Sequence, residues 1–421
     1  MMRRVLETLI GFAALTGIVI GITTLTPADL PRVSTVEAAR SSKVVCVPAA
    51  SGATVMVDNT TTVTPLGGPA SETDRAVLRE QESSVVAEGT TTPVGGALAG
   101  TGSVRTLTQC VKPVSQGVIA LPATADTQLR LVNPDASEAA VDLTLYGADG
   151  EIQSLGARGI ALAAHQERTI ALSILTSEAT PVGVAFKASR GRAAVMAVTQ
   201  TQTSATASAP SQLGTSHLIP GVPAGATSTV VVLANPGETR ATANLTAFGT
   251  TPAYQPQGGG NISIPAHSSV SVPLENALLG EASAIQVSSD EPVMAGLSFT
   301  LGDAAQVAPV TMATSLVTFT APGGVLQLTN PGQAEVQATV TATGAGGAEE
   351  TSTVSVGAGQ TAVHSLPAGA DLGQRVVVES AQPLFGAVVS SGDNGSWAAP
   401  LEQMGSGGVP PLEAELDPEL H

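Results

Sequence analysis

The stretch VVVLANPGETRATANLTAFG, residues 230–249, decides the fold because two other stretches repeat its pattern. They are LRLVNPDASEAAVDLTLYG at residues 129–147 and LQLTNPGQAEVQATVTATG at residues 326–344. In each copy an apolar strand ends at an Asn-Pro pair and a polar turn follows. A second strand then alternates apolar and polar residues, which places one of its faces on a core. The chain therefore contains a repeated β-unit.

The Asn-Pro pairs have a mechanical explanation. An asparagine side chain can bond to the main chain in an Asx-turn, and proline has no N–H with which to continue a ladder. We therefore interpret the pairs as structural turns rather than as binding residues. The residues concerned are Asn133, Pro134, Asn235, Pro236, Asn330 and Pro331.

Composition supports an all-β protein. The chain has 421 residues, of which 43% are hydrophobic and only 2% aromatic, with 45 glycines and 28 prolines to form turns. Each copy contains about seven short strands separated by turn signals, which is the pattern of an immunoglobulin-like or fibronectin-like sandwich. The sequence predicts tandem β-sandwich domains of this kind after an N-terminal transmembrane helix.

The repeat also predicts the domain boundaries. A degenerate copy precedes the three clear ones, and in it Asn59 stands where Asn235 stands. We expect the degenerate unit at residues 41–116 and the β-sandwich repeats at 117–203, 216–302 and 314–400.

The segments outside these units are polar. The joint that starts at Gln200 and the one at residues 302–315 are interpreted as linkers. The tail, residues 401–421, is acidic and rich in proline and glycine, so we expect it to be disordered.

The two cysteines, Cys46 and Cys110, lie on the first and last strands expected for the degenerate copy. In a chain outside the cytoplasm such a pair predicts a disulfide. No cysteine or histidine stands at metal-ligand spacing from either, which disfavours a metal site or a catalytic thiol.

The N-terminal segment, residues 1–30, predicts a membrane anchor. Arg3 and Arg4 precede an uncharged apolar run from Thr8 to Leu25, and basic residues stay on the cytoplasmic side of a membrane. We expect a single-pass protein of the cell membrane with its C-terminal domains outside the cytoplasm. The alternative is a cleaved signal segment and a secreted protein.

Charge and composition exclude some partners. The formal net charge of −17 argues against nucleic acid and against an anionic membrane surface, which both need a basic field. One Trp, two Tyr and six Phe are too few for the aromatic platforms that stack on sugars.

The histidines do not assemble a catalytic motif in the sequence. There is no G-x-S-x-G, S-x-x-K, H-E-x-x-H or P-loop motif. His165 and His267 occupy the same turn in two different repeats, and Gly359 replaces them in the third. Repeated placement favours a role in the turn, so we predict no catalytic residue, no cofactor and no metal.

Other polar or aromatic candidates are weak. The acidic pairs Asp290–Glu291 and Glu349–Glu350 stand beside predicted turns and lack the spacing of a calcium loop. The single tryptophan, Trp397, fits either an exposed binding residue or a packing residue at a domain end.

The phrase NP…LTLYG…DG…IPAHSS…EPV.A covers residues 117–400 and resembles the repeated extracellular sandwiches of bacterial surface proteins. With the N-terminal segment and the Cys46 unit, the chain is similar to an uncharacterised family of actinobacterial secreted or membrane-anchored proteins of unknown function. Members are often found near a large glycosyltransferase and mannose-activating enzymes. The resemblance implies a link to envelope glycan assembly and transfers no catalytic residue, because the family has none assigned.

These observations predict a non-enzymatic, membrane-anchored scaffold or binding protein of the cell envelope. Its partners would be the cytoplasmic membrane, through the N-terminal helix, and an envelope protein or glycan. The alternatives are a secreted adhesin or glycan-binding protein and, third, a hydrolase whose site lies between domains.

Overall fold

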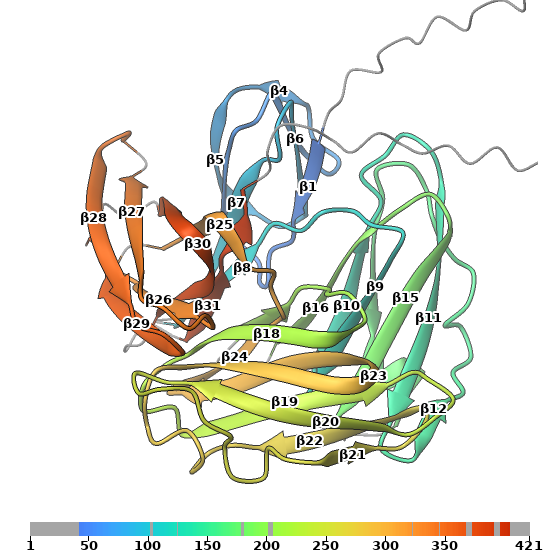
Figure 1. Ribbon diagram of the computed structural model, residues 1–421. Helices are drawn as coiled ribbons and strands as arrows, with labels where there is room; N and C mark the ends of the chain where they lie inside the picture. Colours follow the sequence, from blue (N-terminus) through green and yellow to red (C-terminus); the bar gives the residue numbers. More distant parts are fainter. Residues whose placement is uncertain are drawn as a thin grey trace, which may run out of the picture. The chain divides into compact units, whose positions relative to one another are not determined.

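The computed structural model describes residues 42–101, 104–123, 125–177, 181–200, 205–321, 323–344, 346–367, 373–390 and 396–404. Within these residues the regular secondary structure is antiparallel β-strand, apart from a single short helix, α2 (Leu172–Leu175). The all-β prediction is confirmed. Figure 1 colours the strands along the sequence, from blue for β1 to red for β31.

The described chain forms four successive units, each made of two layers of strands around an apolar cluster. The first unit contains the strands β1–β8, the second β9–β17, the third β18–β24 and the fourth β25–β32. Valine, leucine, isoleucine and alanine from alternate positions of the strands fill the clusters, because successive side chains of a strand point to opposite faces.

The first unit has two four-stranded sheets. One sheet contains β1 (Ser42–Cys46), β6 (Val85–Gly89), β3 (Thr62–Pro65) and β4 (Ser71–Glu72), in this order. The other contains β5 (Arg75–Gln81), β2 (Ala53–Asp58), β7 (Val94–Thr101) and β8 (Val104–Gln109).

The second unit repeats this arrangement with longer strands. One sheet contains β12 (Gly150–Ile152), β11 (Ala139–Gly147), β15 (Val182–Arg190) and β9 (Gln116–Leu121), with β13 (Ile160–Leu162) also paired to β11. The other contains β14 (Glu167–Ala171), β10 (Thr127–Val132), β16 (Ala194–Gln200) and β17 (Ala205–Ser208).

In the third unit one long strand, β23 (Ser283–Leu301), belongs to both layers. Its first half pairs with β18 (Gly214–Val222) and β20 (Ala241–Phe248), and β20 also pairs with β21 (Ile262–Ile264). Its second half pairs with β19 (Ser228–Asn235) and β24 (Asp303–Val307), and β19 also pairs with β22 (Ser268–Pro273).

The fourth unit is built like the third around β30 (Gln374–Ser390). The first half of β30 pairs with β25 (Ala313–Thr320) and β27 (Val336–Gly344), which in turn pair with β32 (Glu402–Gln403) and β28 (Glu349–Val356). The second half pairs with β26 (Val325–Asn330) and β31 (Trp397–Pro400), and β26 pairs with β29 (Gln360–Ser365).

The joints between the units differ from the sequence expectation. In both segments interpreted as linkers the chain folds back as a strand: β17 pairs with β16, and β24 pairs with β23. Glu402 and Gln403, at the start of the expected tail, form β32. These polar segments adopt strands because each lies beside the open edge of a preceding or neighbouring sheet, which propensity along the chain does not encode.

The expected membrane anchor, Thr8–Leu25, lies outside the described residues. None of the helices in the described part of the chain has both the length and the apolar character needed to cross a bilayer.

Candidate functional site

The asparagine of each Asn-Pro pair anchors its turn. Asn235 is fully buried at the end of β19. Its Nδ2 donates to the carbonyl oxygens of Thr239, at 2.7 Å, and of Ile264, at 3.2 Å, while its Oδ1 accepts the N–H of Gly237 at 2.9 Å. Asn133 and Asn330 make the equivalent bonds. The amide satisfies main-chain groups on both sides of the turn, which is a structural task.

The histidines at the repeated turn adopt a left-handed main-chain conformation. The φ angles are 52° at His165, 55° at His267 and 65° at the equivalent Gly359. The three N–H groups donate to equivalent carbonyl oxygens, those of Asp135, Gly237 and Gly332. What the three positions share is the turn geometry, and the two imidazoles belong to different units.

The acidic pairs lie on strands rather than in loops. Asp290 and Glu291 are in the middle of β23, and the Asp290 carboxylate accepts the N–H of Thr242 at 2.6 Å. Glu349 and Glu350 begin β28 and are exposed. No cluster of histidine, cysteine or acidic residues suited to a metal ion occurs among the described residues.

Cys46 and Cys110 form a disulfide within the first unit, with a sequence separation of 64 residues. Cys46 ends β1, and Cys110 directly follows β8. Both sulfur-bearing side chains are buried in the apolar cluster of the unit. The bond therefore ties the last strand of the first unit to its first strand.

Trp397 is also a packing residue. It lies in β31 with only 4% of its surface exposed and belongs to the apolar cluster of the fourth unit.

Buried contacts join the first unit to the second and the second to the third. Val45 and Val86 of the first unit share an apolar cluster with Met196 and Val198 of the second. In the next junction Val118, Ala120 and Tyr146 pack against Val232, Ala234 and Met294. The close approach there has no room for side chains, since a Cβ on Gly296 would lie 2.4 Å from the carbonyl oxygen of Ala120.

Two further junctions complete a cycle of contacts. Phe248 of the third unit meets Phe385 of the fourth edge to face, and the Thr361 hydroxyl donates to the Phe248 carbonyl oxygen at 2.6 Å. The fourth unit in turn contacts the first: Gln109 Nε2 donates to the carbonyl oxygen of Phe319 at 2.8 Å. Leu107 of the first unit is part of the fourth unit's apolar cluster. Each unit is thus held by two neighbours.

The four edge strands β8, β17, β24 and β31 meet where the units converge. β8 contacts β17 and β31, and β24 contacts the same two strands. Together with the segments that follow them they line a cavity of about 420 Å³. All four units contribute to its wall, so the site exists only in the folded whole.

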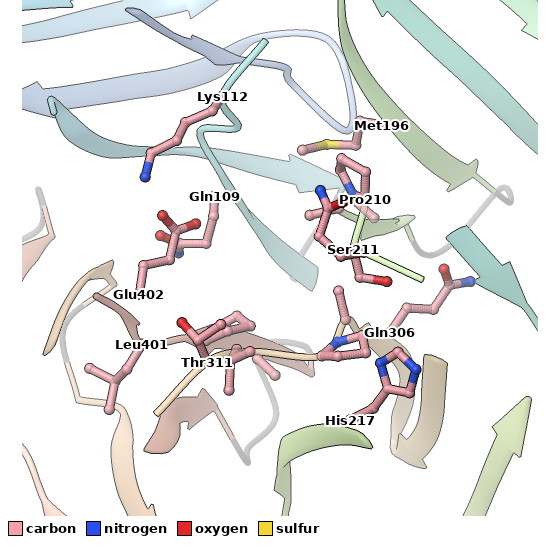
Figure 2. A pocket seen from close by; sticks show the side chains of 18 of the residues that line it. Gln109, Lys112, Met196, Pro210, Ser211, His217, Gln306, Thr311, Leu401 and Glu402 are labelled. Carbon is pink, nitrogen blue, oxygen red and sulfur yellow. The ribbon is translucent and has the colours of Figure 1, made fainter. Parts of the chain in front are cut away.

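Figure 2 shows the polar side chains of this cavity. Lys112, Gln109 and Glu402 gather on one side, while His217 and Gln306 lie on the other. Two adjoining cavities of about 270 Å³ and 150 Å³ share Glu402 with the first. Glu402 therefore stands where the three spaces meet.

Burial shifts the pKa values of two side chains at the cavity, those of Glu402 and His217. Burial raises the pKa of the Glu402 carboxyl above its ordinary value, and the charge of Lys112 partly opposes this. Neighbouring protein surrounds the Glu402 side chain, which borders the cavity and keeps part of its surface accessible to solvent. Burial lowers the pKa of His217, although hydrogen bonds to the main chain favour its charged form.

The side chains of His217 and Ser211 are engaged with the main chain. His217 Nε2 lies 2.8 Å from the carbonyl oxygen of Val293 and 3.0 Å from that of Gly214. Carbonyl oxygens only accept hydrogen bonds, so Nε2 carries the proton. The Ser211 hydroxyl donates to the Val118 carbonyl oxygen at 3.4 Å.

Sequence reasoning missed the cavity residues, although a signal was present. An Ala-Pro pair follows or ends the edge strand in three units: Ala209-Pro210, Ala308-Pro309 and Ala399-Pro400. The prolines of all three pairs line the cavity. This second repeat lay in the segments interpreted as linkers and at a domain end, and it would have extended the repeat to the joints.

Comparisons with known proteins place the chain in a family but do not supply a function. No curated protein matches it. One solved structure, a tetra-tandem repeat in the extending region of a large adhesion protein, is 12% identical, with coverage of 87% of this chain and 96% of that one. Its TM-score is 0.12. The model of a family of unknown function, DUF5719, matches residues 69–367, and the chain therefore belongs to this family.

Proposed function

We propose that the protein is a non-enzymatic, membrane-anchored scaffold or binding protein of the cell envelope that acts outside the cytoplasm. The observation that carries this proposal is the cycle of buried contacts, in which each of the four units packs against two others. Units held in this way keep their outer surfaces at fixed separations, which suits the positioning of an envelope protein or glycan.

The units themselves are proposed to be immunoglobulin-like or fibronectin-like β-sandwiches. Support comes from the two antiparallel layers in each unit and from the apolar cluster between them. Such folds host many functions, so the architecture is compatible with a scaffold and does not select a ligand.

The location outside the cytoplasm is supported by the disulfide, since such bonds persist in oxidising compartments. The uncharged run Thr8–Leu25 behind Arg3 and Arg4 supports the anchor. Retention of the protein in membranes after a high-salt wash would favour the anchored form. A mature N-terminus near Ala39, with protein free in the medium, would favour the secreted alternative.

Two groups in the cavity have chemistry that a hydrolase would need, but their hydrogen bonds do not support that alternative. A serine nucleophile requires a neighbouring base that accepts its proton. Among the described residues no hydrogen bond joins the Ser211 hydroxyl to His217: the hydroxyl donates to the Val118 carbonyl oxygen, and His217 bonds to the carbonyl oxygens of Gly214 and Val293. We therefore do not propose the hydrolase as a second function.

The test is complementation of a strain that lacks the wild-type protein. Alanine variants at His165, His267, Glu291 and Glu350 should each retain function, because these side chains serve turns or solvated strands. Deletion of the unit at residues 216–302 should abolish function.

A variant that disturbs one junction sharpens the test. Gly296→Val places a side chain where a Cβ would already lie 2.4 Å from the Ala120 carbonyl oxygen, so the second and third units should separate and function should fall. Gly346→Ala is the control, because nothing lies within 4 Å of its Cβ position. The scaffold proposal is wrong if a single alanine variant folds, reaches normal abundance and still abolishes function.

A further inference from the structure

The cavity at the meeting point of the four units has the size of a small-molecule site. Its volume is about 420 Å³, and ligand pockets commonly span about 300–1,000 Å³. The wall combines apolar side chains such as Leu107 and Met196 with polar groups from different units. A ligand there would touch parts of the chain that are far apart in sequence.

Lys112 and Glu402 are the charged groups that face this space. Their side chains approach each other in Figure 2, and the field of Lys112 acts on the Glu402 carboxyl. Within the described residues neither head group has a protein hydrogen-bond partner at direct distance. An ammonium donor and a carboxyl group, both facing the cavity, therefore remain available to a molecule inside it.

Lys112 and Glu402 together disfavour a ligand with a net charge. An anion would be attracted by Lys112 and repelled by the Glu402 carboxylate. A cation would be attracted by Glu402 and repelled by Lys112. A ligand charge that leaves water for the cavity wall and meets a like charge there is costly. The favoured ligand is uncharged and carries both donors and acceptors, with which it can bridge Lys112 and Glu402.

The other side chains that line the cavity also indicate which class of ligand fits. Hydroxyl and carboxamide side chains border the cavity, among them Ser211, Thr311, Gln212 and Gln403, and each of these groups both donates and accepts. The described lining contains no Phe, Tyr or Trp, so flat aromatic ligands lack the large aromatic side chains on which they usually stack.

An extended peptide fits less well than a compact ligand. Peptides usually bind sheet edges through main-chain hydrogen bonds. Pro210, Pro309 and Pro400 stand just after or at the end of the edge strands β17, β24 and β31, and proline cannot donate to a ladder.

We propose that the central cavity binds a small, uncharged molecule rich in hydroxyl groups, no larger than a disaccharide, with Lys112 and Glu402 as its recognition pair. This site is independent of the scaffold role, since a body that positions partners on its outer surfaces can also hold a ligand at its centre. The four edge strands form the site together, so binding reports on the intact cycle of units.

The experiment is isothermal titration calorimetry and saturation-transfer NMR on the purified full-length chain. The uncharged probes are methyl α-glucoside and sucrose. Glucose 6-phosphate, glucosamine and glycylglycine supply an anionic, a cationic and a zwitterionic arm. We expect the uncharged probes to bind, and the anionic and cationic probes to bind more weakly by about tenfold or more, as expected for an unpaired charge next to a charged hydrogen-bonding group. Glycylglycine, whose two charges could pair with Lys112 and Glu402, tests whether the site prefers a zwitterion.

Variants of the recognition pair should change selectivity in opposite directions. Lys112→Met and Glu402→Gln should both weaken methyl α-glucoside binding, by about tenfold if a charge-assisted hydrogen bond is lost. Glu402→Gln should improve the relative affinity for glucose 6-phosphate, and Lys112→Met that for glucosamine. Lys187→Met and Glu350→Gln, which change exposed residues outside the cavity, are the matched controls and should leave binding unchanged.

Filling the space provides a check that does not depend on charge. Ala308 lines the cavity, and Ala308→Phe should abolish binding while the melting temperature stays near that of the wild type. Binding that survives Ala308→Phe in a folded protein would overturn the site. Binding of glycylglycine in preference to the sugars would overturn the ligand class, and the absence of binding by every probe would overturn the proposal as a whole.

Discussion

The first unit and the three later units are stabilised by different interactions. In the later units a buried asparagine, such as Asn235, bonds to main-chain groups on both sides of the turn. In the first unit the corresponding Asn59 is exposed, has a φ of 60° and takes no part in such a network. That unit is instead closed by the disulfide between Cys46 and Cys110.

The difference shows where each unit draws its stability. The buried asparagine amide of each later unit forms hydrogen bonds only within that unit. The turn of each later unit is therefore stabilised by residues of the unit itself. The first unit depends on a covalent bond and on charged contacts with its neighbours. Asp58 pairs with Arg375 of the fourth unit, and Lys43 pairs with Asp135 of the second.

The largest expected effect comes from removing the disulfide. Replacing both Cys46 and Cys110 by alanine should lower the free energy of unfolding by about 2–4 kcal/mol, because the unfolded chain loses a long closed loop. Denaturant titration measures the loss, and hydrogen exchange should locate it in β1–β8. Reductant should reproduce the effect in the wild type and add nothing in the variant. A loss smaller than that of Asn235→Ala would mean that the neighbours, rather than the disulfide, hold the first unit.

Asn235→Ala tests the other half of the comparison. It leaves buried carbonyl oxygens without a donor, and the free energy of unfolding should fall by about 2–3 kcal/mol. Asn59→Gly is the matched control and should change it by less than about 0.5 kcal/mol, because glycine tolerates the positive φ angle. Equal losses of unfolding free energy in denaturant titration would show that Asn59 and Asn235 contribute equally to stability.

Acid should weaken the ion pairs of Asp135, which lies in the turn of the second unit and also pairs with Lys43 of the first unit. The pKa of Asp135 is lowered, first by its hydrogen bond to Arg192 and also by Lys43, while burial opposes the shift. Its contribution to stability is therefore present above the ordinary value of 3.8 and disappears as the pH falls through the lower folded pKa.

Asp135→Asn should accordingly lower stability near neutral pH by about 0.5–1 kcal/mol, a value reduced for the partial exposure of the pair. The difference from the wild type should vanish in strong acid, where the wild-type carboxyl is protonated. Urea titrations across this pH range provide the measurement. Glu138→Gln, which removes an ion pair exposed on both sides, should have almost no effect. A pH-independent difference would rule out titration of Asp135 as the cause.

The smallest effect concerns the repeated turn. His165 is exposed at a φ of 52°, where the equivalent residue of the fourth unit is Gly359. His165→Gly should raise the free energy of unfolding by about 0.5 kcal/mol, because relief of left-handed strain slightly exceeds the entropy cost of glycine. His165→Ala should lower it. A loss of stability with glycine would reveal a contact of the imidazole that outweighs the strain.

The sequence predicted the features that are local. The alternation around residues 230–249 was enough for an all-β chain, because a period of two specifies a half-buried strand. The cavity could not be predicted in the same way. Lys112 and Glu402 are 290 positions apart in the numbering of the chain, and what brings them together is the packing of whole units. No periodicity along the sequence encodes that contact.

The joints were the least predictable part. Polar residues such as Thr206 and Ser208 have the composition of a linker, yet both are buried in β17 because an adjacent strand and unit cover them. The repeated Ala-Pro pairs were the available signal, and they are recognisable only when the joints are aligned as part of the repeat.

The inward position of β8, β17, β24 and β31 also affects the solubility of the chain. Each of these strands is the last in its row and has a partner on one side only, and such edges can template pairing with other molecules and lead to aggregation. Here they face one another at the centre, and prolines follow or end three of them. The same arrangement that forms the cavity thus keeps four open edges away from other copies of the protein.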